Sequence, residues 1–282
     1  MSKFTCGRIL YILKTPFRVK MLFGLCLFFI SQPSIAVIVE QEIESHYTGA
    51  NYDLWIYSSD SIEDGDTFDV LVFLDANLKF GKYIKEFVLA PENKAKKIMA
   101  IGIGHTGNYR KARRRDFIFP YDGEQADKSF GHADLFYKFL MEEVMDLLHG
   151  TKKTDVEMGE ITLLGHSLSG LFASIVLLQS NNPFDHIIAY SPSLWVKKNG
   201  IINLILTDSL DSISPPCTTH YYVTYGSMER LNKISSSVKL FTTELAARKS
   251  KTIGITQIRM PKHFHNSYVQ KRINIDLSSL LL

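Results

Sequence analysis

Residues 160–173, EITLLGHSLSGLFA, run from an apolar segment through a serine to a segment of small and apolar side chains. This order predicts a buried strand, a sharp turn and a helix, which is the context of a nucleophile elbow. The elbow needs small residues two positions before and after the serine, because the two backbones approach closely there. Gly165 and Ser169 hold these positions, although Ser169 replaces the usual glycine at an expected cost in strain. We predict that Ser167 is a nucleophile; the alternative is a buried serine in an ordinary turn.

The rest of the chain alternates between strand and helix patterns. Continuous apolar runs are typical of strands that are buried on both faces of a parallel sheet. Such runs occupy 70–74, 98–103, 161–164, 187–190, 221–225 and, more weakly, 255–260, and edge strands are expected at 38–46 and 52–57. Apolar residues recur at helical spacing in 135–148, 168–179 and 231–248. We expect residues 37–282 to form a single α/β domain around a mostly parallel sheet.

The first 36 residues differ from the rest. Five cations precede the apolar run 21–30, which is followed by Ser34-Ile35-Ala36. A positive region, a short apolar region and a small-x-small site predict a secretory signal peptide, so the mature chain begins at Val37 and is expected in the periplasm. The alternative of an uncleaved anchor requires a longer apolar run. A lipid anchor at Cys26 is disfavoured because Leu25 is too large for a lipoprotein cleavage site.

Removal of this segment changes the charge of the protein. It contains five of the 32 Lys and Arg and none of the 29 Asp and Glu, which leaves 27 cations against 29 acids. The net-acidic mature chain gives no argument for a nucleic-acid partner. Cys217 is the one cysteine after residue 36, so no internal disulfide is expected, and an inert thiol is the simplest interpretation.

A nucleophilic serine needs a histidine base, and the histidine needs an acid to orient it. The segment after the run 255–260 contains His263 and His265, and both are candidates for the base. In the chain order nucleophile, acid, histidine, the acid follows the preceding strand, where Glu229 is suitably placed. Asp208 and Asp211 precede that strand and are expected at the wrong end of the sheet.

Several short motifs together resemble the esterase branch of the α/β-hydrolase fold, which includes S-formylglutathione hydrolases, feruloyl esterases and mycolyltransferases. The likeness is greatest to its siderophore esterases, among them periplasmic enterobactin hydrolases, and extends over nearly all of the mature chain. The motifs are Val70-Leu71-Val72-Phe73-Leu74-Asp75, Gly102-Ile103-Gly104, Arg115-Asp116-Phe117 with Pro120, Gly165-His166-Ser167-Leu168 with Gly170-Leu171-Phe172, Ser191-Pro192-Ser193-Leu194-Trp195, Tyr225-Gly226-Ser227 with Glu229, and His265-Asn266-Ser267.

The resemblance implies an α/β-hydrolase fold and roles for particular residues. It favours His265 over His263 as the base, and it places the oxyanion hole at the backbone N–H groups of Leu168 and Asn77. Such donors meet charge that develops in the tetrahedral intermediate. The family usually has glycine where this chain has Ala76, and this difference bears on the loop that carries Asn77. Some siderophore esterases work with a serine–histidine pair, which bears on the role of Glu229.

A run of cations, Tyr109-Arg110-Lys111-Ala112-Arg113-Arg114-Arg115-Asp116, follows the strand that ends near Gly104. A solvated loop is the ordinary interpretation of such a run. At the rim of a site in a net-acidic chain it favours an anionic ligand instead, with Arg113, Arg114 and Arg115 as substrate-binding residues. We expect Trp195 either to pack beneath the pocket or to stack on the substrate.

Three function classes follow from these observations. The first is a serine esterase for carboxylic esters, with a catecholate trilactone siderophore as the favoured substrate. The second is an acyltransferase or thioesterase that uses the same residues, and the third is a non-catalytic ligand-binding protein on a hydrolase scaffold. We expect a small-molecule ester partner, no cofactor, no metal because the histidines lack paired spacing, and no membrane anchor after signal cleavage.

Overall fold

The computed structural model describes residues 38–59, 65–119, 131–150, 157–206, 218–229, 233–248 and 252–281. The expected signal peptide, Pro120, the acids Asp208 and Asp211, and Cys217 lie outside these ranges. In the described ranges, no helix has both the length and the apolar character that crossing a membrane requires.

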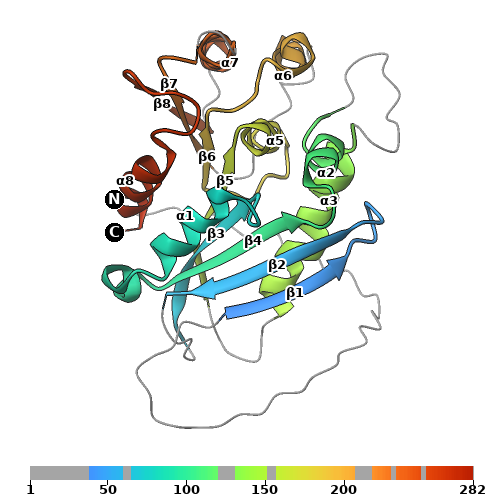
Figure 1. Cartoon of the computed structure of the whole chain (residues 1–282), viewed down its shortest axis with the longest axis vertical. Coiled ribbons are helices and arrows are strands. Elements are labelled where there is room, and N and C mark those ends of the chain that lie inside the picture. The colour runs from blue at the N-terminus through green and yellow to red at the C-terminus, as the bar shows by residue number, and fades with distance from the viewer. Residues whose placement is uncertain are drawn as a thin grey trace.

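Within the described ranges, one sheet of eight strands has the order β1-β2-β4-β3-β5-β6-β7-β8 (Figure 1). β2 is antiparallel to both of its neighbours, β1 and β4. The strands β4, β3, β5, β6, β7 and β8 run parallel to one another. The predicted α/β class with a mostly parallel sheet is confirmed. The strands are β1 (Ile38–Glu44), β2 (Asn51–Ser58), β3 (Thr67–Leu74), β4 (Ile98–His105), β5 (Glu157–His166), β6 (His186–Tyr190), β7 (Thr219–Gly226) and β8 (Ile253–Met260).

Helices cover both faces of the sheet (Figure 1). The predicted helix at 135–148 is found as α3 (Ala133–Lys138), η2 (Phe139–Val144) and α4 (Met145–Gly150), and those at 168–179 and 231–248 as α5 (Leu168–Val176) and α7 (Ile234–Ala247). The helical segments that the sequence analysis did not predict are α1 (Lys79–Val88), η1 (Pro91–Lys96), α2 (Tyr109–Asp116), α6 (Val196–Leu206) and α8 (Val269–Leu280).

The cationic run 109–116 is therefore a helix and not an irregular loop. Its eight residues have no apolar periodicity, so the hydrophobic pattern gives no helix signal. The side chain of Asn108 caps the helix by accepting a hydrogen bond from the backbone N–H of Lys111 at 3.3 Å. The last residue, Asp116, is fully buried and fixes the C-terminal end of α2 against the core.

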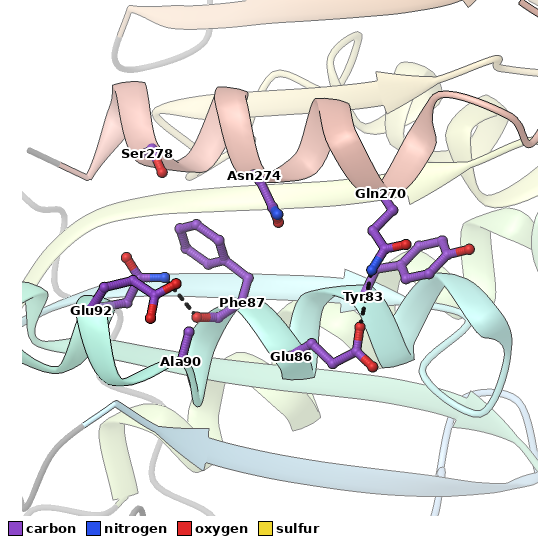
Figure 2. A pocket seen from close by; sticks show the side chains of 9 residues that line it. Tyr83, Glu86, Phe87, Ala90, Glu92, Gln270, Asn274 and Ser278 are labelled. Carbon is purple, nitrogen blue, oxygen red and sulfur yellow. Dashed lines mark hydrogen bonds between the residues drawn. The ribbon is translucent and has the colours of Figure 1, made fainter.

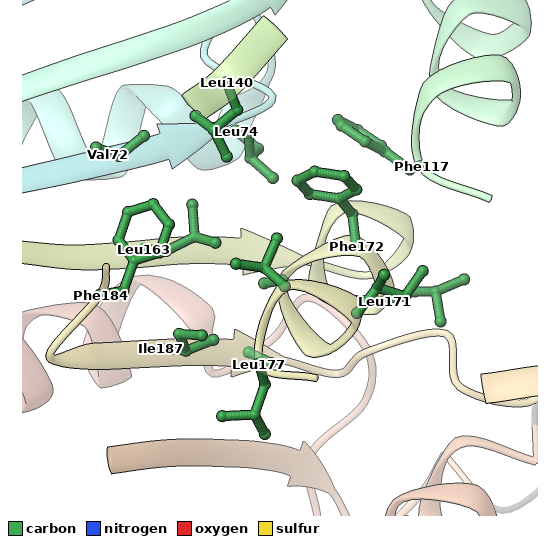
Figure 3. Packing of buried hydrophobic residues seen from close by; sticks show 14 of the residues in the cluster. Val72, Leu74, Phe117, Leu140, Leu163, Leu171, Phe172, Leu177, Phe184 and Ile187 are labelled. Carbon is green, nitrogen blue, oxygen red and sulfur yellow. The ribbon is translucent and has the colours of Figure 1, made fainter. Parts of the chain in front are cut away.

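Apolar side chains from the sheet meet the helices in two clusters. On one face, Phe172 of α5 packs against Phe117 and Phe136, with ring centroids 5.6 and 5.0 Å away. Figure 3 shows Phe172 beside Phe117. On the other face, α1 and α8 cover side chains such as Leu71 and Ile188. Because both faces are covered, the apolar stretches of the central strands are buried, which explains why these stretches read as continuous apolar runs.

The parallel strands end at a common edge of the sheet, and this edge collects polar residues. Asp75 follows β3, Ser167 follows β5, and Ser191 follows β6. The loops after β7 and β8 carry Glu229 and His265. Ligands of open α/β sheets bind outside the carboxyl ends of the strands, so this edge is where a site is expected.

Candidate active site

Ser167 lies in a strained turn between β5 and α5. Its backbone has φ 61° and ψ −113°, a conformation that residues with a side chain adopt at a cost. A Cβ atom at Gly165 would collide with the carbonyl of Ser169, so glycine is required where the strand and the helix approach. The Ser167 N–H donates to the carbonyl of Tyr190 at 2.9 Å, which holds the turn against β6.

Ser169 fastens the same turn through its side chain. Its buried hydroxyl accepts a hydrogen bond from the His166 N–H and donates one to the His166 carbonyl, both at 2.9 Å. A glycine at this position could make neither bond. The serine that departs from the usual pattern therefore adds support to the elbow.

Glu229 and His265 form a hydrogen-bonded pair. His265 Nδ1 lies 3.2 Å from Glu229 Oε2, and the Glu229 side chain is 1% exposed while that of His265 is 28% exposed. The other carboxylate oxygen, Oε1, accepts the Gly226 N–H and the Ser191 hydroxyl, both at 2.7 Å. A Cβ atom at Gly226 would clash with the His263 carbonyl, so glycine lets the two loops meet.

The two candidate histidines have different partners. His263 Nδ1 lies 3.0 Å from Ser267 Oγ, within its own loop, whereas His265 reaches Glu229. The His265 loop also contacts the elbow, because His166 Nε2 lies 3.1 Å from the His265 carbonyl and the two rings are 4.7 Å apart. The structure thus brings His265, and not His263, to the predicted acid.

The Ser167 hydroxyl faces Ser193, with their Oγ atoms 3.4 Å apart, and the Ser193 N–H donates to the Ser167 carbonyl at 2.9 Å. Among the hydrogen bonds of the described residues, none joins Ser167 to His265. Bonds between a nucleophile and its base are often long until substrate binds, so this geometry is compatible with the pairing.

The two expected oxyanion donors come from the start of α5 and from the loop after β3. Leu168 is the first residue of α5, where backbone N–H groups have no partner inside the helix and the helix dipole favours negative charge. Asn77 is exposed in the loop after β3, and its side chain donates to the His105 carbonyl at 2.8 Å. Ala76 fits beside it because Gly81 and Gly102 lack the Cβ atoms that would collide with it.

Of the three predicted substrate-binding arginines, two form ion pairs. Arg113 makes a two-point pair with Asp75 at 2.7 and 2.9 Å, directly before Ala76. Arg115 pairs with buried Asp116, and the Asp116 pKa is lowered because hydrogen bonds from Arg115 and His105 outweigh the effect of burial. Arg114 is exposed, and so are two other cations of α2.

Some residues near the site were not predicted as functional. Ser191, Ser193 and Tyr268 contact the residues described above, and the first two were noted only as part of the Ser-Pro-Ser motif. Met228 and Phe264, which were also not predicted, are 48% and 60% exposed next to Glu229 and His265. Trp195, a predicted substrate-binding residue, is 41% exposed two residues after Ser193. For Met228 and Phe264, the sequence signal that could have identified them is a large apolar residue next to a polar site residue.

A cavity of about 170 Å³ lies elsewhere, between α1 and α8 (Figure 2). Its lining includes Tyr83, Glu86 and Asn274, and none of the residues of the site above. In the described part of the chain, no three His, Cys, Asp or Glu side chains are grouped so that they could hold a metal ion.

Residues 45–225 match the model of the family described as "Putative esterase". This match extends over more than half of the chain, and the chain therefore belongs to this esterase family. The sheet order and flanking helices are those of the α/β-hydrolase fold, which confirms the predicted fold.

Proteins of known activity resemble parts of the chain. The ferri-bacillibactin esterase BesA of Bacillus subtilis is 30% identical over 146 residues, which are 46% of this chain and 50% of BesA. The siderophore triacetylfusarinine C esterase of Aspergillus fumigatus is 35% identical over 98 residues, 35% of this chain and 33% of that protein. The chain thus spans a third to a half of the length of these curated relatives.

The fold is also that of a solved siderophore hydrolase, EstB from Aspergillus nidulans. The two structures superimpose with a TM-score of 0.71 at 17% identity, over 90% of this chain and 97% of EstB. At this identity the likeness establishes the fold.

The structure predicts a pH dependence of stability at His166. Burial, together with the neighbouring His265, lowers the pKa of His166 from 6.5 to about 4. Below pH 6.5 the His166 side chain is protonated in the unfolded chain but stays neutral in the folded chain. The free energy of unfolding therefore decreases as the pH falls toward 4. The loss is about 1.4 kcal/mol per pH unit and reaches roughly 3 kcal/mol.

Urea unfolding at pH 7, 5.5 and 4.5 measures this slope. His166→Gln should flatten it, whereas His46→Gln, at an exposed histidine, should leave it unchanged. A slope that is equally steep in the His166 variant would contradict the assignment.

Proposed function

We propose that this protein is a serine hydrolase that cleaves carboxylic esters through an acyl-enzyme. Ser167 is the nucleophile, His265 the general base and Glu229 the acid that orients the base. The observation that carries the proposal is the convergence, at one edge of the sheet, of a strained serine turn and a hydrogen-bonded Glu229–His265 pair whose carboxylate is buried. Membership of the esterase family supports the same reaction class.

In the proposed reaction, the Ser167 oxygen attacks the ester carbonyl while His265 takes the proton of the Ser167 hydroxyl. The N–H groups of Leu168 and Asn77 stabilise the negative charge on the carbonyl oxygen. His265 then gives the proton to the leaving alcohol, and the acyl group stays on Ser167. A water molecule, activated by His265 in the same way, releases the acid and restores the serine.

We propose a siderophore ester, of the catecholate trilactone type, as the substrate. The names of the relatives from Bacillus subtilis and Aspergillus fumigatus support this class, since both are siderophore esterases. The exposed cations of α2 suit an anionic ligand, with Arg114 as the contact, whereas the charges of Arg113 and Arg115 are neutralised by their ion pairs with Asp75 and Asp116. Exposed Trp195 can stack on an aromatic ring of the substrate.

The two other function classes make different predictions. An acyltransferase would pass the acyl group to an added alcohol in preference to water, and a thioesterase would prefer thioesters. A non-catalytic binding protein would bind the ester without turnover. A screen of p-nitrophenyl esters, with and without an added alcohol, beside ferric and iron-free catecholate trilactones separates these classes.

Ser167→Ala should lower kcat for a p-nitrophenyl ester by roughly 10⁴-fold or more, because no other group forms the acyl-enzyme. A fluorophosphonate probe should label Ser167 in the wild type, as intact mass and peptide mapping would show. Ser193→Ala is the matched control. The Ser193 hydroxyl lies beside Ser167 but should not react with the probe, so this variant should still be labelled at Ser167. Folded wild-type protein that resists the probe would favour the binding-protein alternative.

His265→Ala should reduce kcat about as much as loss of Ser167. The two residues act as a unit, so loss of either one removes the same catalytic step. His263→Ala should have a much smaller effect, since its ring contacts Ser267 within its own loop. Glu229→Gln should cost less than His265→Ala if a serine–histidine pair carries most of the rate. Steady-state kinetics of the three variants tests this order, and the reverse ranking of the histidines would move the base to His263.

Arg114→Ala should raise KM several-fold for a ferric catecholate ester at low salt and leave a small neutral ester unaffected. The effect should shrink as salt screens the charge, over a Debye length of about 10 Å at 0.1 M. Lys82→Ala, which removes an exposed cation from α1, is the control. Equal losses on both esters would assign Arg114 a structural role, and a wild type that does not prefer anionic esters would remove the siderophore hypothesis.

We also propose that residues 1–36 direct the chain to the periplasm and are removed there. The mature protein should begin near Val37 and appear in the soluble periplasmic fraction. Intact-mass measurement of the secreted protein checks this expectation. A mass that retains residues 1–36, or that includes lipid on Cys26, would refute it.

A further inference from the structure

We propose that Ser191 and Tyr268 are positioning residues that hold the carboxylate of Glu229 in the orientation that His265 needs. The inference rests on the proposed role of Glu229 as the orienting acid. It adds a second layer to the site, formed by two hydroxyl groups that come from the loops after β6 and β8. Among the hydrogen bonds of the described residues, neither hydroxyl bonds to Ser167. Both act through Glu229.

The contacts form a continuous buried chain. The Ser191 hydroxyl donates to Glu229 Oε1 at 2.7 Å, and the Tyr268 hydroxyl lies 2.6 Å from Ser191 Oγ. The Tyr268 hydroxyl also lies 2.8 Å from the Thr224 carbonyl of β7. Because the Ser191 proton goes to Glu229, the single Tyr268 proton is shared between Ser191 Oγ and this carbonyl. Ser191 and Tyr268 are 0% and 1% exposed, so both hydroxyls are shielded from bulk solvent.

The backbone at Ser191 indicates that this hydroxyl is placed at a cost. Ser191 has φ 42°, a left-handed conformation that is unfavourable for a residue with a side chain. Its N–H donates to the Thr224 carbonyl at 2.7 Å, which ties the end of β6 to β7. Residues held in such conformations cluster at functional sites, where the surrounding structure imposes them. Here the consequence is a hydroxyl directed at the carboxylate.

Tyr268 joins the histidine loop to this chain of bonds. It precedes α8 directly and follows His265 by three residues. Burial raises the pKa of Tyr268, so its hydroxyl stays protonated and can donate. Because the Tyr268 side chain reaches back to Ser191 and to β7, the loop that carries His265 is anchored on the same network that holds its acid.

The two oxygens of the Glu229 carboxylate have different partners. Oε1 is engaged by two donors, the Gly226 N–H and the Ser191 hydroxyl, and Oε2 is left for His265. Removal of the Ser191 hydroxyl would leave one donor on Oε1 and let the carboxyl plane rotate. A rotated carboxylate would hold the imidazole less well and slow each step in which His265 carries a proton, while substrate binding would be unchanged.

The test compares Ser191→Ala and Tyr268→Phe with Tyr221→Phe in the full protein. Tyr221 is an equally buried tyrosine on β7, and its hydroxyl bonds to Ser174 at 2.7 Å, away from Glu229. Ser191→Ala should lower kcat for a p-nitrophenyl ester about tenfold or more, the scale on which outer-layer partners act in other sites. Tyr268→Phe should have a smaller effect in the same direction. KM should stay within about twofold of the wild-type value, and Tyr221→Phe should retain the wild-type kcat.

Two further measurements separate positioning from a general loss of stability. In a Glu229→Gln background, Ser191→Ala should add little to the loss in kcat, because its effect passes through the carboxylate. The proton of the imidazole N–H that is bonded to Glu229 should give a downfield NMR signal in the wild type. This signal should weaken in Ser191→Ala and Tyr268→Phe and persist in Tyr221→Phe.

The outcomes distinguish this inference from the proposed function. Losses in Ser191→Ala and Tyr268→Phe no greater than in Tyr221→Phe would overturn it, as would full additivity with Glu229→Gln. A Glu229→Gln variant with full activity would also overturn it, while the Ser167–His265 hydrolase would survive. If the wild type turned over no ester, the proposed function would fail, and the NMR signal would still decide whether the hydroxyls hold the pair. Tyr268→Phe keeps the test open if Ser191→Ala does not fold.

Discussion

The close approach of β5 and α5 is the constraint on which the site depends. A Cβ atom at Gly165 would collide with the Ser169 carbonyl. Ser167, which connects the strand to the helix, has a positive φ. The neighbouring bonds are arranged around this turn: Ser169 fastens His166, Tyr190 accepts the Ser167 N–H, and Ser193 donates to the Ser167 carbonyl. Together they offset a backbone conformation that would be costly alone.

Buried charge is the second organising feature. Each buried carboxylate at this edge of the sheet has specific partners: Glu229 has Gly226, Ser191 and His265, and Asp75 has Arg113. A buried charge without such partners would be strongly destabilising, so removal of one partner affects more than a single contact. Asp75 of the Asp75–Arg113 pair lies two residues before the expected oxyanion residue Asn77. The same interactions that keep the charges stable therefore fix the loops of the candidate site.

The sequence could predict the parts that depend on local pattern. Apolar runs and helical spacing identified the strands and three of the helical regions, and the small residues around Ser167 identified the elbow. Helix α2 escaped prediction because its cationic residues have no apolar face, and its stability comes from the Asn108 cap and buried Asp116. The role of Ser169 was also missed, because a small side chain in a pattern does not reveal that its hydroxyl bonds to His166.

What the sequence alone determined is the order of the elements, the α/β class and the kinds of residue that follow each strand, since these depend on neighbours along the chain. Only the tertiary structure decided which of those residues meet. His263 and His265 are two positions apart, yet the path of their loop brings His265 to Glu229 and leaves His263 with Ser267. Ser191 and Tyr268 are 77 residues apart and touch because β6, β7 and the start of α8 converge. Such contacts depend on long-range packing, which no local pattern encodes.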